Sequence, residues 1–115
     1  MEINNVYSIY FSPSGTTKKI VKRISSILHK EKVSYHSLLS HRKVNRTLSQ
    51  NELLIIGLPV FSGRIPSLCK ELLKELHGMN TPAITIVTYG NRDYEDALIE
   101  LKNTLETQGF NIIGA

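Results

Sequence analysis

The chain has 115 residues and a formal net charge of +4, with 41% hydrophobic and 21% charged residues. This length suits a single domain with one hydrophobic core, and the composition is that of a globular protein rather than a disordered one. The chain contains neither an apolar run of membrane-spanning length nor a signal segment, so we expect a cytoplasmic protein without a membrane span. The single cysteine, Cys69, excludes an internal disulfide bond.

The positive charge is concentrated in the first half of the chain. Between Thr17 and Arg46 the only acidic residue is Glu31, whereas acidic residues outnumber basic ones after Arg46. We therefore expect one strongly basic surface, which suits an acidic partner. We do not expect nucleic acid to bind there, because the basic run lacks a pattern of interleaved aromatic side chains. The basic residues of this run are Lys18, Lys19, Lys22, Arg23, Lys30, Lys32, Arg42, Lys43 and Arg46.

Apolar segments that are typical of strands alternate with helical patterns along the whole chain. Strands are predicted at 6–11, 33–38, 52–57 and 82–88, and a fifth strand begins at Phe110. This alternation predicts an α/β fold in which an open parallel sheet has helices on both faces.

Three helices are predicted between these strands. The first spans 16–29 and should bury Ile20, Ile24, Ile27 and Leu28. The second carries an apolar stripe from Ile65 to Leu76 and should end at His77 and Gly78. The third should bury Ala97, Leu98, Leu101 and Leu105 and end at Gly109. The segment 39–51 shows no sustained period and is expected to be a polar connection or at most a short helix.

Three loops carry residues that suit ligand binding, and each loop follows a predicted strand. In an open parallel sheet the carboxyl ends of the strands meet at one edge, where ligands bind. The loop at 12–17 should bind a phosphate, because a turn there leads into the free amides of a helix start and is surrounded by short hydroxyl groups. The loops at 57–66 and 88–94 offer aromatic faces beside glycines, which suits a flat ring. A mononucleotide with a large aromatic ring fits this division.

At this point the sequence resembles a known family, the flavodoxins. YFSPSGTTKKI is similar to their phosphate loop, LLIIGLPVFSGRIP to their second loop beside the flavin, and TYGNRDYEDAL to their third loop. The resemblance covers nearly the whole chain. It is greatest to the flavodoxin domains of bacterial and archaeal proteins in which an iron–sulfur ferredoxin module often follows. It implies one flavodoxin-like domain over residues 1–115, with strand order 2-1-3-4-5 and FMN as the cofactor.

The resemblance also implies which residues hold each part of FMN. The phosphate would be bound by Ser12, Ser14, Gly15, Thr16 and Thr17. The ring would lie between two groups, Pro59, Phe61, Ser62, Gly63 and Arg64 on one side and Tyr89, Gly90, Asn91 and Tyr94 on the other. The peptide between Ser62 and Gly63 would be the switch beside the flavin N5, since glycine permits a positive φ. The implied chemistry is electron transfer by the flavin, with no catalytic residue and no metal, so we expect a redox carrier rather than a self-contained enzyme.

Two features depart from familiar flavodoxins, which are acidic and end in a helix after the fifth strand. Arg64 and Arg92 beside the proposed ring predict a less reducing flavin, and the basic surface predicts an acidic redox partner such as a ferredoxin. The lack of a closing helix after the fifth strand predicts a C-terminally truncated chain. It also predicts an apolar patch near the third and fourth strands, through which a dimer can form.

Two other functions stay open from the sequence. One is a flavin-free interaction module that keeps this fold and binds a partner through its basic face. The other is an NAD(P)H-dependent flavin or quinone reductase, since such enzymes share the fold. A response regulator is excluded because Ser12 and Pro13 stand where acidic residues are needed. A tyrosine phosphatase is excluded because Cys69 lies on the apolar stripe of a helix, where we expect a buried thiol.

Overall fold

The computed structural model describes residues 3–28, 32–40, 42–60, 64–88 and 94–114. Its centre is a sheet of five parallel strands in the order β2-β1-β4-β6-β7. These strands are β1 (Asn5–Tyr10), β2 (Val33–Ser37), β4 (Glu52–Pro59), β6 (Thr81–Thr88) and β7 (Phe110–Gly114). Counted along the main sheet alone, this is the predicted order 2-1-3-4-5, which is confirmed.

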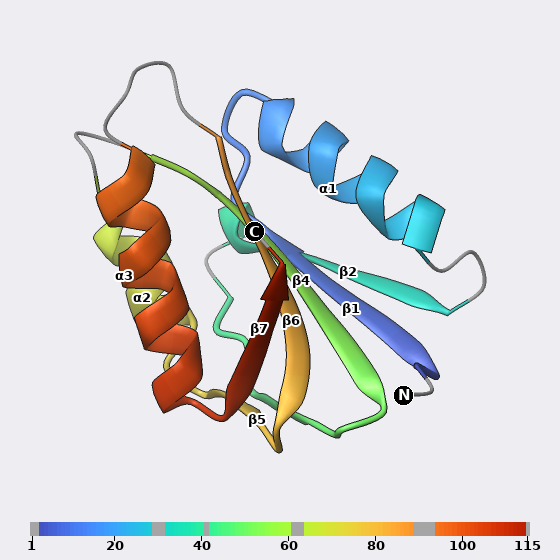
Figure 1. The fold of residues 1–115 in the computed structure, drawn as a ribbon. Helices are drawn as coiled ribbons and strands as arrows, with labels where there is room; N and C mark the ends of the chain where they lie inside the picture. The colour runs from blue at the N-terminus through green and yellow to red at the C-terminus, as the bar shows by residue number, and fades with distance from the viewer. Residues whose placement is uncertain (1–2, 29–31, 41, 61–63, 89–93, 115) are drawn as a thin grey trace.

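Helices cover both faces of the sheet, as the sequence predicted. One face carries α1 (Thr16–Leu28), and the other carries α2 (Ser67–Leu72) and α3 (Tyr94–Thr107), as Figure 1 shows. The predicted fold class is therefore confirmed. None of the helices in the described part of the chain is long and apolar enough to cross a membrane.

The two faces of the sheet bury cores of different size. Alternate residues of β4 separate them, because Leu54 and Ile56 pack toward α2 and α3 whereas Leu53 and Ile55 pack toward α1. The core on the α2 and α3 side is much the larger and includes residues from both helices. Cys69 is fully buried in it, as predicted, and burial raises the pKa of its thiol to about 12.

The buried side of α1 differs from the predicted one. Thr17, Val21 and Ser25 face the sheet, whereas Ile20, Ile27 and Leu28 are exposed, with Ile27 reaching 67%. Small side chains face the sheet because α1 lies very close to it. The Ser25 hydroxyl, 2.7 Å from the buried hydroxyl of Ser8, also donates to the Val21 carbonyl, so the polar atom is satisfied inside the core. The prediction for Ile20, Ile27 and Leu28 was wrong, and only Ile24 packs partly against this core.

The second predicted helix is also shorter than expected. It ends at Leu72, and residues 76–78 form β5 (Leu76–Gly78), which pairs in parallel with β3 (Arg46–Leu48). The side-chain amide of Gln108 donates to the carbonyls of Leu73 and Leu76, so these groups have partners without a longer helix. Gly109 ends α3 with a φ of +100°, as predicted, and lies so close to Gly78 that a side chain there would overlap its backbone.

The segment 39–51, predicted to be a polar connection or at most a short helix, contains most of the short 3₁₀ helix η1 (Leu38–Ser40) and also the strand β3, which was not predicted. Arg46 fixes β3 against the main sheet, because its guanidinium lies 4.5 Å from the centre of the Tyr7 ring and 3.9 Å from Oε2 of Glu52. A strand of three residues has too few positions to show an alternating pattern in the sequence. Residues 46–48 form a strand because they pair with β5.

An apolar surface lies beside α1, but its position differs slightly from the predicted one. The third strand of the sheet, β4, is covered, since Leu53 and Ile55 are buried. Ile84 and Ile86 of β6 are only half-buried, and Ile113 of β7 is 54% exposed. The uncovered area therefore lies over β6 and β7, and pairing of two chains through it stays a prediction.

Replacing Gly57 by alanine tests the close packing of α1 against β4. A Cβ atom at Gly57 would overlap a methyl group of Val21 and would lie 3.0 Å from Cγ2 of Thr17. We expect Gly57→Ala to lower the free energy of unfolding by about 1–3 kcal/mol, measured by urea denaturation. Gly114→Ala is the matched control, because its Cβ would lie 3.6 Å from the nearest side-chain atom, in Ile84. An unchanged unfolding free energy for Gly57→Ala would contradict this packing.

Candidate functional site

Backbone and side-chain hydrogen bonds join the carboxyl ends of β1, β4 and β6. The amide of Phe11 donates to the carbonyl of Gly57 at 3.1 Å, and the amide of Val60 donates to the carbonyl of Thr88 at 2.9 Å. The hydroxyl groups of Thr17 and Thr88 lie 2.7 Å apart and form a further hydrogen bond. The starts of all three predicted ligand loops therefore lie at one edge of the sheet.

The first loop turns sharply into α1. The amide of Gly15 donates to the carbonyl of Ser12 at 3.3 Å, and Gly15 has a φ of +90°. A positive φ suits glycine, since other residues are strained there. The Ser12 hydroxyl accepts the amide of Lys18 at 2.9 Å, so this side chain caps the helix start.

The hydroxyl groups of this loop divide into two pairs. Ser12 and Thr17 are buried. The Ser12 hydroxyl accepts a hydrogen bond from the Lys18 amide, and the Thr17 hydroxyl forms one with the Thr88 hydroxyl. Ser14 and Thr16 are exposed, and their hydroxyls lie 3.4 Å apart. The structure therefore brings all the predicted phosphate residues together, with the exposed pair turned to solvent and the buried pair holding the loop.

Several backbone amides of the loop have no partner in the described part of the chain. Within the described residues, the amides of Ser14, Thr16 and Thr17 donate to no protein group. They lie next to the N-terminus of a helix whose dipole favours negative charge. Successive free amides around a glycine of positive φ form a concave anion site. This geometry fits a phosphate group.

The basic surface predicted from the sequence begins at the same edge. Lys18, Lys19, Lys22 and Arg23 are all exposed on α1, which contains no acidic residue. The Lys22 ammonium lies 5.1 Å from the centre of the Tyr35 ring on β2, so this lysine extends over the sheet edge. The anion site and the cationic helix thus form one positive region.

The residues predicted to line the ring are only partly described. Pro59 is the half-buried last residue of β4, and Arg64 is exposed near the end of the second loop. Tyr94 is the first residue of α3. Phe61, Ser62, Gly63, Tyr89, Gly90, Asn91 and Arg92 lie outside the described residues, as does the predicted switch at residues 62–63.

Glu100 of α3 binds the end of the second loop, which the sequence did not reveal. Its Oε2 atom accepts hydrogen bonds from Arg64 at 3.1 Å and from Lys70 at 2.8 Å, and its Oε1 atom accepts the amide of Ile65 at 3.2 Å. The hydrogen bond from Lys70, followed by those from Arg64 and Ile65, lowers the pKa of this carboxyl to about 2 against the opposing effect of burial. The available signal was a carboxylate at the border of the apolar stripe formed by Ala97 and Leu101.

A hollow lies at the opposite edge of the sheet, where the strands begin. It has a volume of about 320 Å³ and is lined by Gln50, Asn51, Asn80 and Asn111. Its lining consists of uncharged amide side chains, and it shares no residue with the three loops. It is therefore separate from the site at the carboxyl edge.

Comparison with protein families agrees with this arrangement. The family model for the flavodoxin domain matches residues 8–110, which includes all three loops. The chain belongs to the flavodoxin domain family. Among curated proteins no relative matches the sequence.

Solved structures share the fold of this flavodoxin domain at low sequence identity. A flavoprotein in complex with FMN from Lactobacillus acidophilus NCFM is 18% identical, with a TM-score of 0.68 over 97% of this chain and 91% of that chain. A flavodoxin from the domain Archaea is 16% identical, with a TM-score of 0.71 over 96% of this chain and 78% of that chain. At these identities the likeness concerns the fold.

The contacts of Glu100 predict a pH-dependent contribution to the stability of this flavodoxin domain. Its pKa falls from the usual 4.5 to about 2 on folding, so its contribution is complete above pH 4.5 and is lost as the pH falls toward 2. We expect Glu100→Gln to lower the free energy of unfolding by about 1 kcal/mol at pH 7, a typical value for a partly exposed charged hydrogen bond.

The measurement is a series of urea unfolding curves between pH 7 and pH 2.5 for both proteins. The difference between them should shrink as the pH falls below 4.5. A difference that stays constant over this range would show that ionised Glu100 does not stabilise the fold.

Proposed function

We propose that this domain binds FMN and carries electrons between partner proteins. The observation that carries the proposal is the anion site of the first loop, where free amides of Ser14, Thr16 and Thr17 surround a glycine of positive φ. A phosphate monoester has the charge and the acceptor oxygens that such a site stabilises. The family match and an FMN-bound structure of the same fold support FMN as the molecule that carries this phosphate.

Each part of the first loop has a role in this proposal. The three free amides and the exposed hydroxyls of Ser14 and Thr16 donate to the phosphate oxygens. Ser12 and Thr17 hold the turn and the helix start in place through their bonds to Lys18 and Thr88. Gly15 supplies the backbone conformation and leaves room, since no atom lies within 4 Å of a Cβ built there.

The ring would lie over the second and third loops, beside the phosphate site. Pro59, Arg64 and the start of α3 at Tyr94 are the described residues of that region. The aromatic residues Phe61, Tyr89 and Tyr94 are proposed to contact the ring. Bound FMN would supply one- and two-electron transfer, and the protein would orient it and set its potential.

The proposal is tested by titrating the purified chain with FMN and with riboflavin, which lacks the phosphate. Flavin fluorescence quenching and visible absorbance give both dissociation constants. We expect tighter binding of FMN, and we expect Ser14→Ala to weaken FMN binding about tenfold while riboflavin binding stays unchanged, because one hydrogen bond to a charged group is lost. Ser26→Ala is the matched control, since Ser26 is an exposed serine of α1 outside the first loop, and its hydroxyl donates to the carbonyl of Arg23.

Circular dichroism establishes that each sample is folded. A folded wild-type chain that binds neither flavin would refute the proposal and favour a flavin-free interaction module. Equal affinity for FMN and riboflavin would show that the first loop does not hold the phosphate.

We further propose that the redox partner is acidic. The exposed cations of α1 begin next to the phosphate site, and no carboxylate on α1 balances them. Opposite charges steer association and raise its rate at low salt. We expect a reduced acidic ferredoxin to transfer electrons to the oxidised FMN-loaded domain rapidly at low salt, because opposite charges bring the two proteins together.

Stopped-flow absorbance at increasing salt measures this rate. The rate with the acidic donor should fall as salt is added, and Lys19→Glu should lower the rate at low salt as well. A rate that is independent of salt, or that rises as salt is added, would contradict an acidic partner.

A further inference from the structure

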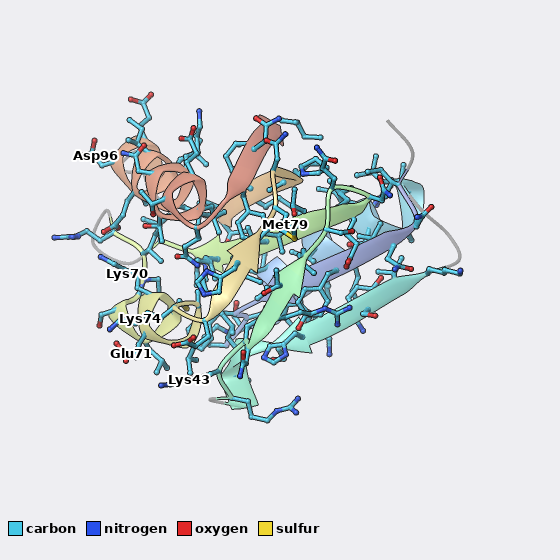
Figure 2. The ribbon with its side chains drawn as sticks, turned by 90° about the horizontal axis from the view of Figure 1, so that it is seen from below. Lys43, Lys70, Glu71, Lys74, Met79 and Asp96 are labelled. Atoms are coloured by element: carbon cyan, nitrogen blue, oxygen red, sulfur yellow. The ribbon has the colours of Figure 1, made fainter. Side chains whose placement is uncertain are left out.

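Glu100 connects three separate parts of the described structure. It projects from α3 and binds the Arg64 guanidinium, the Ile65 amide and the Lys70 ammonium of α2. Figure 2 shows Lys70 on the side of α2 that faces α3, whereas Glu71 lies on its far side. The carboxylate is thus held between the two helices, where the chain leaves the second loop.

The second loop is fixed at both ends by hydrogen bonds. At its start, the amide of Val60 donates to the carbonyl of Thr88. At its end, the amide of Ile65 donates to Glu100, and the Ile65 side chain is buried in the larger core. Only residues 61–63 and Arg64 lie between these fixed points. Glu100 and the buried Ile65 side chain therefore both hold the end of the loop in place.

Other contacts besides those of Glu100 connect the regions of α2 and α3. Leu72 of α2 belongs to the same buried core as Leu101 and Leu105 of α3. Beyond the helix ends, the Gln108 side chain donates to the carbonyls of Leu73 and Leu76. Among these contacts only those of Glu100 reach the end of the second loop, which suits a role of this carboxylate in the loop.

We propose that Glu100 is the positioning residue for the ring-binding loop: it fixes the Arg64–Ile65 end of that loop and balances the charge of Arg64 beside the flavin ring. This inference rests on the proposed binding of FMN. Two cations, Arg64 and Lys70, share the single Glu100 carboxylate. Loss of this carboxylate leaves both cations unbalanced at the ring end of the site, where positive charge favours a reduced, anionic flavin.

Two substitutions separate positioning from charge. Glu100→Gln keeps an oxygen that can accept the Ile65 amide but removes the negative charge, whereas Glu100→Ala removes both. Glu106→Gln is the matched control, because Glu106 is an exposed carboxylate on the same helix. Thermal unfolding of each variant at pH 7 establishes that it is folded at the temperature of the assay.

The first readout is the affinity for FMN and for riboflavin. We expect Glu100→Ala to weaken both by a similar factor of about ten, because the loop end contacts the ring and not the phosphate. Glu100→Gln should weaken them less. Ser14→Ala changes only the affinity for FMN, so the two parts of the site are distinguished.

The second readout is the midpoint potential of the bound flavin. We expect Glu100→Gln to shift it to a more positive value while Glu106→Gln leaves it unchanged. A purely structural ion pair would not produce this difference between two carboxylates of one helix.

Each outcome decides the inference. Wild-type affinity for both flavins in Glu100→Ala would overturn the positioning role, as would a loss confined to FMN. An unchanged potential in Glu100→Gln would overturn the charge role. If the folded wild-type chain binds no flavin, the proposed function itself fails, which is a different result from flavin binding that ignores Glu100.

Discussion

Thr88 makes the interactions on which the geometry of the site depends. It is the last residue of β6, and its hydroxyl bonds to Thr17 while its carbonyl accepts the amide of Val60. Parallel strands bring their carboxyl ends to one edge, but they do not fix how loops of different length approach one another there. Thr88 connects two of these loops, because it contacts both Thr17 at the start of α1 and Val60 at the start of the second loop. In the proposed site, Thr88 would therefore link the loop that binds the phosphate to the start of the loop that binds the ring.

The position of α1 has the same importance for the anion site. Gly57 lets the helix lie close to β4, and Ser25 satisfies its hydroxyl inside the contact. Because Thr17 is buried in this interface, the first turn of α1 cannot rotate without breaking the bond to Thr88. The free amides are therefore held in one orientation before any ligand arrives, which reduces the cost of ordering them. The same close packing leaves Ile20 and Ile27 in solvent, so part of the apolar surface is not used for stability.

The sequence predicted the features that repeat along the chain and missed those that depend on one distant contact. Strand positions follow from apolar runs that alternate with helices, whereas the strand order was implied by the resemblance to flavodoxins. The strands β3 and β5 could not be predicted, since each has three residues and exists because it pairs with the other. The prediction of which side of α1 is buried was wrong. Hydrophobicity favoured the isoleucines, whereas the close packing of α1 against the sheet buries Thr17, Val21 and Ser25. The role of Glu100 was missed because its partners lie 30 to 36 residues away in the sequence and no local pattern marks them.

The distribution of charge separates binding from redox tuning in the proposed site. At the phosphate end the cations of α1 have no carboxylate on their own helix, so their field adds to that of the helix dipole. At the ring end the charge of Arg64 is opposed by Glu100, at a distance of 3.1 Å. Field strength decreases with distance, and opposite charges that lie close together cancel most of their effect on a third group. If the proposals hold, the cations of α1 would act mainly on the phosphate and on an acidic partner. The potential of the ring would depend instead on a local balance among Glu100, Arg64 and Lys70.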